Sequence, residues 1–398
     1  MSRSSRPVLT VFFDGLKPEG LTSMPFLSSM PYRAPLRTLL GYSIACHASM
    51  YTGVYPDRHG LWFLWQRSPE TSPFAWLRKV PLLSLVDSLP ARLGVHKLTA
   101  SRCPYTSYWG LPRIVNLPLR YWPEVDVSET RYWDEDGYVP GYPTVFERLR
   151  AAQVPYDTLG LHRGGSGPHG IEAVEHKPLP TIKPWTYLFV GEPDGLSHRY
   201  TQEGPQTKAM LRRLDQIVEA RYREFESRVG EFDFIAYSDH GHIAIEDRIN
   251  PYELFEQSAD DLNRYMHLID AGYLRLWFRT PEERSQAERV LANVPQGYIL
   301  DEETMAREHV DPGEGRYGEL IFYLNAGTIF SWTTFGYGRK QRSMHGYLPS
   351  HPESDGVFIT NCSRPTEKVV QLVDILPTLL DRLGLPVPAG LDGQPVLA

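Results

Sequence analysis

Acidic and histidine side chains occur in short clusters that are widely separated along the chain. In order they are Asp14, Asp194 with His198, the adjacent pair Asp239-His240, and His345. Carboxylate oxygens and imidazole nitrogens are ligands by which proteins hold zinc and similar divalent ions. Two such ions about 4 Å apart can activate an attacking oxygen and steady a leaving group. Together the clusters therefore predict a two-metal site that hydrolyses phosphate esters.

Ser43, which lies between the first two clusters, is the candidate nucleophile. Residues 43–52 are typical of a short helix that Gly53 would end. A hydroxyl at a helix N-terminus lies beside unpaired backbone N–H groups, which can hold phosphoryl oxygens. Metal coordination would help that hydroxyl lose its proton and become an alkoxide. The simpler alternative is that Ser43 is only the N-cap of the helix, a position where serine is common.

Each acidic-histidine cluster also has a simpler explanation when it is taken alone. An aspartate near a histidine is commonly a helix cap or a hydrogen-bonded surface pair. That explanation loses force when the ends of several predicted strands carry the same chemistry.

Three of the clusters follow predicted strands. Residues 8–13, 185–190 and 232–237 are apolar runs typical of strands buried on both faces of a parallel sheet. In open α/β sheets ligands gather at the carboxyl ends of the strands, so we expect Asp14, Asp194 and Asp239 to meet at one edge. Hydrophobic periodicity predicts further helices at 144–152, 206–227 and 369–383, and further strands at 156–161 and 357–359.

The pattern of expected strands and helices changes between residues 250 and 338. Residues 272–278 alternate like an antiparallel strand, a helix is expected around 287–293, and 297–300 and 320–323 are further candidate strands. We therefore expect an α/β fold, a three-layer sandwich with a mostly parallel central sheet. Residues 1–249 and 339–398 would form the catalytic core, and 250–338 a small α+β cap subdomain. Residues 62–142 are expected to form irregular loops and short helices over the site, within the core.

Composition restricts the remaining functions. The 398 residues carry a formal net charge of −7, which argues against a surface that coats nucleic acid. Cys46, Cys103 and Cys362 are odd in number and share no metal-site spacing, which argues against a disulfide framework and favours a reducing compartment. The N-terminal apolar run is too short for a signal peptide, and no stretch has the length of a membrane span. We expect a soluble cytoplasmic protein, and the sequence gives no indication of its oligomeric state.

Several longer motifs occur in a characteristic order. They are Phe13-Asp14-Gly15, Ser43-x3-His47-x-Ser49-x2-Thr52-Gly53-x-Tyr55-Pro56-x2-His59-Gly60, Glu192-Pro193-Asp194-x3-His198, Ser238-Asp239-His240-Gly241 and Met344-His345-Gly346. Near the C-terminus follow Asp374-Ile-Leu-Pro-Thr-Leu-Leu380 and Leu391-Asp-Gly393. In this combination the chain resembles, over nearly its whole length, the nucleotide pyrophosphatase/phosphodiesterase branch of the alkaline phosphatase superfamily.

The resemblance implies an alkaline-phosphatase-like fold and a set of metal ligands. One ion would be bound by Asp14, Ser43, Asp239 and His240, and the other by Asp194, His198 and His345. In this family both ions are usually zinc, with manganese as the alternative, and the nucleophile is usually threonine, where this chain has Ser43. For the other histidines of the motifs we expect hydrogen bonds to the ligands, or packing; these are His47, His59 and His242.

Two features separate the chain from its relatives. Family phosphodiesterases usually carry an asparagine shortly after the His-Gly step, which binds a phosphate oxygen. Here residues 61–65 are apolar and aromatic, which leaves Gln66 or backbone N–H groups as candidate donors. Trp62, Phe63 and Trp65 are either core residues or a stacking wall for the substrate. The chain also lacks the Cys-x-Pro-Ser-Arg motif of the superfamily's sulfatases, so Cys46 is expected to be a buried neutral thiol.

The expected reaction is hydrolysis of a small phosphate ester through a phosphoserine-type intermediate on Ser43. The ester would be a nucleotide, a sugar phosphate or a lipid-like phosphate, and the resemblance favours a phosphodiester or a pyrophosphate. One alternative is a phosphomonoesterase, and another is a phosphotransferase that passes the phosphoryl group to an acceptor alcohol. A non-catalytic binding protein is disfavoured, because keeping six inward polar groups without metal chemistry would be costly.

Overall fold

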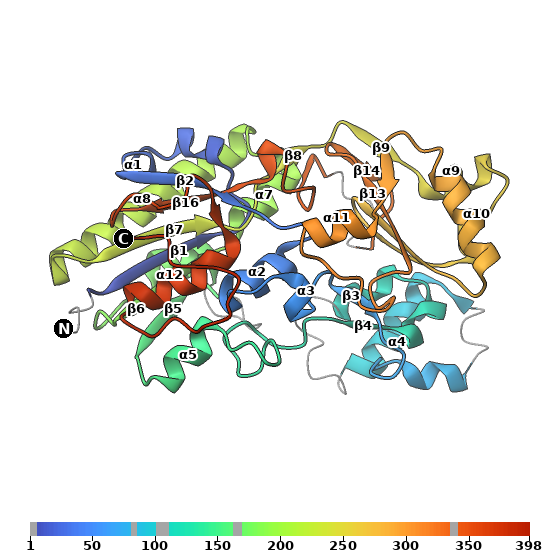
Figure 1. The fold of residues 1–398 in the computed structure, drawn as a ribbon, viewed down its shortest axis with the longest axis horizontal. Coiled ribbons are helices and arrows are strands. Elements are labelled where there is room, and N and C mark those ends of the chain that lie inside the picture. The colour runs from blue at the N-terminus through green and yellow to red at the C-terminus, as the bar shows by residue number, and fades with distance from the viewer. Residues whose placement is uncertain (1–5, 81–85, 101–110, 162–168, 335–340) are drawn as a thin grey trace. The chain divides into compact units, whose positions relative to one another are not determined.

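The structure, a computed structural model, describes residues 6–80, 86–100, 111–161, 169–334 and 341–398 (Figure 1). The chain divides into two compact units. The first comprises Met1–His59, Tyr132–Ala244 and Gln341–Ala398, and the second comprises Gly60–Arg131 and Ile245–Lys340. This division groups residues 60–131 with the segment 245–340, whereas the sequence placed them with the catalytic core, and the division into core and cap stays a prediction.

A mixed, mainly parallel sheet forms the centre of the first unit. Within the described residues it has seven strands in the order β17-β2-β16-β7-β1-β6-β5. Strands β5 (Tyr156–Leu159), β6 (Trp185–Val190), β1 (Val8–Phe13) and β7 (Asp233–Ser238) run parallel to one another. Strand β16 (Gly356–Thr360) lies antiparallel between β7 and β2 (Tyr32–Arg37), and β17 (Val370–Gln371) pairs with the other side of β2.

Helices cover both faces of this sheet. Leu9, Val11 and Phe13 of β1 belong to the same buried cluster as Leu211 and Leu214 of α8 (Pro205–Val229). Helices α1 (Pro25–Ser28) and α6 (Gly170–His176) contact α8 on this side. The alternate residues of the strands face the other layer, which contains α2 (Ser43–Thr52), α5 (Val145–Ala151) and α12 (Ile375–Arg382). The expected three-layer sandwich is confirmed.

Most predicted elements of this unit are found within a few residues of their expected bounds. The exception is the helix expected over 369–383. Its first residues instead form β17 and a 3-10 turn (Leu372–Asp374), and the α-helix begins at Ile375. The cause is that Val370 and Gln371 pair with Leu36 and Arg37 at the edge of the sheet, and these backbone hydrogen bonds exclude a helix there.

The second unit contains an antiparallel sheet. Within the described residues its strands are β10 (Met266–Asp270), β11 (Tyr273–Trp277), β13 (Leu320–Leu324) and β12 (Gly297–Ile299), in that order. Helices α9 (Pro251–Gln257), α10 (Pro281–Leu291) and α11 (Glu302–Arg307) belong to the same unit. Its other segment supplies α4 (Leu89–Ala100) and the strand pair β3 (Trp65–Arg67) and β4 (Val125–Val127).

The aromatic cluster after the His-Gly step belongs to the core of this second unit. Trp62, Phe63 and Trp65 are each at most 1% exposed, and Phe63 packs against Tyr273 and lies beneath the Arg275 guanidinium. Side chains so fully enclosed leave no face for a substrate ring, so the packing alternative is confirmed and the stacking wall is wrong. Gln66 lies on β3, and its role as a phosphate donor stays a prediction.

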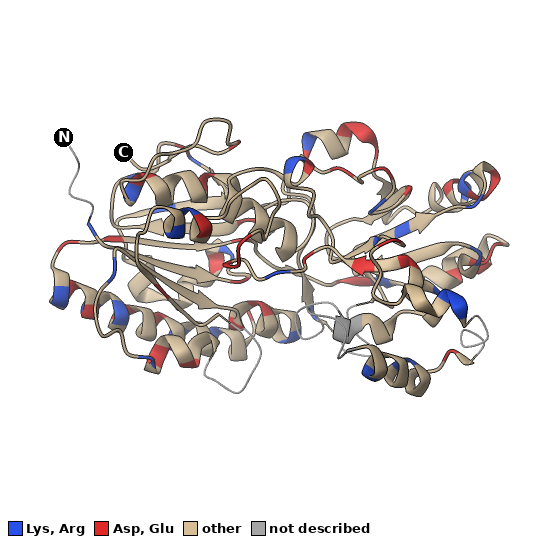
Figure 2. Cartoon of the chain, turned by 90° about the horizontal axis from the view of Figure 1, so that it is seen from below, with Lys and Arg blue, Asp and Glu red and all other residues tan. Residues whose placement is uncertain are grey.

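Charged residues are interspersed by sign along the described helices, as Figure 2 shows. On α8, for example, Arg223 pairs with Glu226 and Arg228 with Glu224. Within the described ranges, no helix is both long and apolar enough to cross a membrane.

Candidate active site

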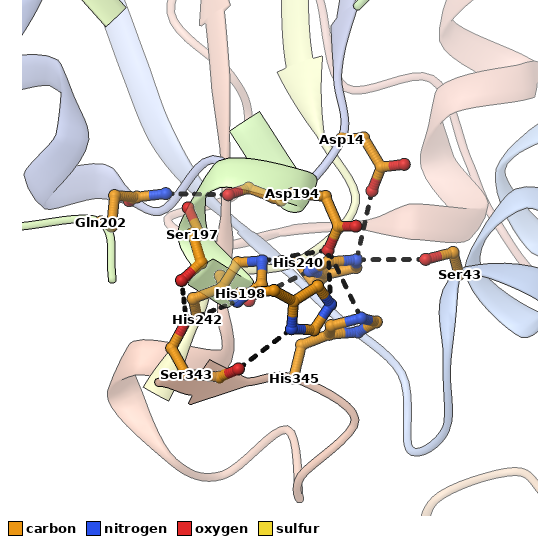
Figure 3. A network of polar contacts seen from close by, with 12 residues as sticks. Asp14, Ser43, Asp194, Ser197, His198, Gln202, His240, His242, Ser343 and His345 are labelled. Atoms are coloured by element: carbon orange, nitrogen blue, oxygen red, sulfur yellow. Dashed lines mark hydrogen bonds and ion pairs between the residues drawn. The ribbon is translucent and has the colours of Figure 1, made fainter. Parts of the chain in front are cut away.

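Three adjacent parallel strands bring the candidate ligands to one edge of the sheet. Phe13, the last residue of β1, is paired with Val190 of β6 on one side and with Ser238 of β7 on the other. The strands therefore end level with one another, and Asp14 and Asp239 are the next residues of β1 and β7. Strand β6 leads into α7 (Glu192–Tyr200), which carries Asp194 and His198 one helical turn apart (Figure 3). The expected meeting of the three aspartates is found.

The loop that follows β1 is fixed by hydrogen bonds on both sides. The Leu16 N–H donates to Ser238 Oγ at 2.7 Å. Gln202 accepts from the Lys17 N–H at 2.9 Å and donates to the Gly15 carbonyl at 2.8 Å. Gly15 has φ +72°, and a Cβ atom there would lie 2.8 Å from His242 Nε2. Only glycine fits this turn without strain, so the backbone beside Asp14 is held in a single arrangement.

The first cluster of ligand atoms surrounds Asp194. Its Oδ1 atom lies 3.1 Å from His198 Nε2 and 3.6 Å from His345 Nε2. One ligand atom from each of these three residues lies within 4.8 Å of the other two, a spacing that suits a single bound cation. His345 reaches this cluster from the segment that follows β15 (Ser343–Met344), far along the chain.

The second cluster contains Asp14, Asp239 and His240. His240 Nε2 lies 3.4 Å from Asp14 Oδ1 and 3.4 Å from Asp239 Oδ2. Asp14, His240 and Asp194 also each offer a ligand atom within 4.8 Å of the others, so Asp194 is close to both clusters. The imidazoles of His240 and His345 stack at 3.7 Å between ring centroids. The structure thus brings together all six carboxylates and imidazoles that the sequence indicated.

Ser43 faces the second cluster. Its Oγ atom lies 3.2 Å from His240 Nε2. The N-cap of α2 is Tyr42, with extended backbone, and Ser43 is the first helical residue. The expectation that Ser43 is the N-cap is therefore wrong by one position, because the chain turns into the helix at Tyr42. Gly53 ends the helix in the left-handed conformation at φ +74°, as expected.

The hydrogen bonds of the histidines show which ring nitrogen is available to a cation. His198 Nδ1 lies 3.0 Å from the Ser343 carbonyl, and His240 Nδ1 lies 3.0 Å from the Gly241 carbonyl. A carbonyl oxygen only accepts hydrogen bonds, so both Nδ1 atoms carry a proton. In the neutral ring the Nε2 atom then carries a lone pair. These lone pairs point at carboxylate oxygens, which repel them unless a proton or a metal ion lies between. Backbone carbonyls commonly orient metal-binding histidines in this way.

Two buried carboxylate oxygens without a hydrogen-bond partner also indicate that the site is built for a cation. Among the described residues, Asp14 Oδ1 and Asp239 Oδ2 are buried and have no hydrogen-bond partner. Leaving carboxylate oxygens in this state is costly. A divalent cation would satisfy both, so the residues present fit the two-ion site that the sequence predicted.

The crowding of carboxylates also changes the affinity of the site for protons. Burial, with the charge of Asp194, raises the pKa of Asp14 to about 6. Burial raises the pKa of Asp239 to about 8. Burial alone would lower the pKa of His240, but the carboxylates of Asp239 and Asp14 outweigh it and raise this pKa to about 10. The second cluster therefore takes up protons when no metal ion compensates its charge.

The remaining histidines of the motifs have different partners. His59 Nε2 lies 2.9 Å from Ser49 Oγ, within the α2 region and away from the aspartates. His47 Nε2 lies 3.6 Å from Asp239 Oδ2, and its ring packs edge-on against Trp133. His242 Nε2 lies 3.1 Å from Asp194 Oδ1. Burial lowers the pKa of all three to about 3, so they are neutral near pH 7.

The sandwich and the ligand clusters at its strand ends define an α/β protein of the alkaline-phosphatase-like kind. The structure of human ectonucleotide pyrophosphatase/phosphodiesterase 5 is similar, with a TM-score of 0.68 over 98% of this chain and 97% of that chain at 12% identity. The murine protein 5, solved alone and as an inactive variant in complex with AMP, gives a TM-score of 0.66 over 96% of each chain at 12% identity. At this identity the likeness shows a shared fold.

The family follows from the sequence. The family model described as type I phosphodiesterase/nucleotide pyrophosphatase matches residues 8–348, which is most of the chain. The protein therefore belongs to this family, and it is a phosphoric ester hydrolase. The resemblance noted from the ordered motifs is confirmed. None of the curated proteins matches the sequence significantly.

Proposed function

We propose that the protein is a two-metal phosphodiesterase or nucleotide pyrophosphatase that uses Ser43 as its nucleophile. The observation that carries this proposal is the meeting of three carboxylates, three imidazoles and one serine hydroxyl beyond β1, β6 and β7. Membership of the family shows that the chain hydrolyses phosphoric esters. The carboxylates and imidazoles supply metal ligands for this reaction, and Ser43 supplies a nucleophile.

We assign the metal ligands as the family resemblance implies. Asp14, Ser43, Asp239 and His240 hold one ion, and Asp194, His198 and His345 hold the other. The mixture of nitrogen and oxygen ligands favours zinc, with manganese as the alternative. When bound, the two ions supply positive charge that activates the attacking oxygen and stabilises the leaving oxygen.

The chain's own residues perform the remaining steps. Ser43 Oγ gives up its proton to solvent and attacks phosphorus, which forms a serine–phosphorus bond and breaks the bond to the leaving oxygen, and that oxygen departs with the bonding electrons and takes up a proton from solvent. A water molecule then breaks the serine–phosphorus bond and regenerates the hydroxyl. The first turn of α2 presents backbone N–H groups beside Ser43, a suitable place for phosphoryl oxygens.

The proposed substrate is a nucleotide diester or pyrophosphate. A murine neighbour with the same fold was solved in complex with AMP, and this supports a nucleotide for the present chain. A sugar or lipid-like phosphodiester is the alternative to be compared directly.

A substrate panel tests the reaction. The chelator-stripped protein would be assayed after addition of Zn²⁺ or Mn²⁺ on p-nitrophenyl phosphate, bis-p-nitrophenyl phosphate and the p-nitrophenyl ester of thymidine monophosphate. We expect the metal to restore activity, and the diesters to be turned over faster than the monoester. Preference for the monoester would overturn the proposed substrate class. Transfer of the phosphoryl group to added glycerol would identify a phosphotransferase.

Ser43→Ala tests the nucleophile. We expect kcat to fall by about three orders of magnitude or more, because no other hydroxyl takes part in the proposed step, while most of the bound metal is retained. Ser43→Thr is the matched control, since it keeps a hydroxyl and should retain part of the activity. Mass spectrometry of acid-quenched enzyme should find the phosphoryl adduct on Ser43. An alanine variant with full activity would rule out covalent catalysis at this residue.

We also propose that the protein works in the cytoplasm. Cys46 and Cys362, the cysteines in the described part of the chain, are both free thiols, and burial raises the pKa of the Cys46 thiol above its ordinary value, which makes it less reactive. Fractionation of cells that produce the full chain would test this, and recovery in a secreted fraction would contradict it.

A further inference from the structure

One histidine outside the proposed ligand set makes a direct hydrogen bond to it. His242 is buried, and its Nε2 atom lies 3.1 Å from Asp194 Oδ1 (Figure 3). A carboxylate oxygen only accepts hydrogen bonds, so a hydrogen bond between these two atoms requires the proton on His242 Nε2. His242 therefore holds Asp194 by donating to it.

The second ring nitrogen of His242 faces a serine. His242 Nδ1 lies 3.1 Å from Ser343 Oγ. In a neutral imidazole with the proton on Nε2, Nδ1 carries a lone pair that faces this hydroxyl. The hydroxyl donates its proton to the Ser197 carbonyl at 2.6 Å. Ser197 stands on α7 between Asp194 and His198, so this contact returns to the helix that carries both residues.

The proton positions distinguish His242 from the proposed ligands. In His198 and His240 the Nδ1 atom faces a backbone carbonyl and keeps its proton, so in the neutral ring Nε2 carries the lone pair that a metal ion needs. His242 Nδ1 faces a hydroxyl in place of a backbone carbonyl, so its Nε2 can carry a proton that Asp194 accepts. His242 is therefore suited to orient a ligand, and the other two are suited to be ligands.

Ser343 connects the two kinds of histidine. Its backbone carbonyl accepts from His198 Nδ1 at 3.0 Å, while its side chain faces His242 Nδ1. Ser343 lies on β15, which pairs with β8 (Ile243–Ala244), the strand directly after His242. This short ladder fixes the distance between His242 and Ser343, and His345 follows Ser343 by two residues. One serine thus contacts two of the histidines that surround Asp194.

We propose that His242 and Ser343 form a positioning pair that aims the Asp194 carboxylate at the ion among Asp194, His198 and His345. The proposal rests on the two-metal function argued above. Hydrogen bonds from outside a metal site commonly fix the direction of a ligand, and their loss weakens metal binding.

His242→Phe is the direct test, because phenylalanine keeps the ring and removes both polar atoms. We expect the affinity of one zinc ion to fall by about 10- to 100-fold, while the ion of Asp14, Asp239 and His240 keeps its affinity. Competition with a zinc chelator measures the two affinities, and elemental analysis gives the stoichiometry. His242→Gln can still donate an amide proton to Asp194, so it should recover part of the loss.

Ser343→Ala tests the other member of the pair. It removes the hydroxyl but leaves the carbonyl that accepts from His198, so the loss of affinity should be smaller and at the same ion. Because both side chains act through one hydrogen-bonded path, the double variant of His242→Phe and Ser343→Ala should be no weaker than His242→Phe alone. Additive losses would overturn the proposed path.

His267→Phe is the matched control. His267 is also buried and lies between two hydroxyls, 3.1 Å from those of Tyr121 and Tyr252, in the second unit. We expect its replacement to lower the melting temperature and to leave both zinc affinities unchanged. If His242→Phe and His242→Gln both bind two ions as tightly as the wild type, the positioning pair is wrong and the two-metal function stands. A wild-type protein that takes up fewer than two ions would overturn both proposals.

Discussion

His345 reaches the site from a part of the chain remote from every other proposed ligand. Its Nε2 atom lies 3.6 Å from Asp194 Oδ1 and its ring stacks on His240. We predict that His345→Ala lowers the metal content from two ions to about one, because Asp194 and His198 alone are too few to hold a zinc ion tightly. Elemental analysis after desalting measures this. The exposed His176, replaced in the same way, is the control, and unchanged stoichiometry in His345→Ala would remove it from the ligand set.

At this scale the sequence predicts ligand types well and their geometry poorly. Asp14, Asp194 and Asp239 could be proposed because each follows an apolar run, and His198 because it stands one helical turn from Asp194. A hydrogen bond from His242 to a ligand was one of its two expected roles, but neither the partner Asp194 nor the contact with Ser343, 101 residues further along, could be predicted. The second histidine in the run Asp239-His240-Gly241-His242 was the signal available, and it did not indicate which residue His242 contacts.

The elements that carry the site were predictable where burial is complete. Strands β1, β6 and β7 are each buried at every position, so their sequences are mostly apolar. Strand β2 was not predicted, because its sequence Tyr-Arg-Ala-Pro-Leu-Arg is mostly half-buried or exposed, with only Leu36 buried, and contains a proline. The packing of residues 60–131 with 245–340 was also missed, because it depends on contacts between segments far apart in sequence.

The end of helix α2 makes an element-scale prediction. Gly53 has φ +74°, and a Cβ atom there would lie 3.2 Å from Leu376 Cδ2 and from Leu391 Cδ1. Gly53→Ala should therefore lower the free energy of unfolding by about 1–2 kcal/mol, through left-handed strain and crowding. Urea denaturation measures this change.

Gly94 supplies the control for that experiment. It lies within α4, and a Cβ atom there would meet nothing within 4 Å. Gly94→Ala should raise the free energy of unfolding by about 0.5–1 kcal/mol, because alanine favours a helix interior over glycine. Equal effects of the two replacements would show that the conformation of Gly53 carries no strain.

At the scale of the whole molecule, the sheet and its flanking helices keep the ligand carboxylates out of water. Burial with the charge of Asp194 raises the pKa of Asp14, burial raises that of Asp239, and the neighbouring carboxylates overcome burial to raise that of His240. A group whose pKa lies above the solution pH keeps its proton. At pH 7 the metal-free protein therefore holds protons on Asp239 and His240, and these must leave before either residue can bind a metal ion.

Zinc binding should accordingly release protons. With pKa values of about 8 for Asp239 and about 10 for His240, we predict that uptake of zinc at pH 7 releases at least about one proton per protein molecule. The number should fall as the pH rises through these values, and the apparent zinc affinity should rise with it, because fewer protons compete. Isothermal titration calorimetry in buffers of different ionisation enthalpy counts the protons released. A heat of binding independent of the buffer at pH 7 would mean that Asp239 and His240 have already lost these protons. It would contradict the raised pKa values of both residues.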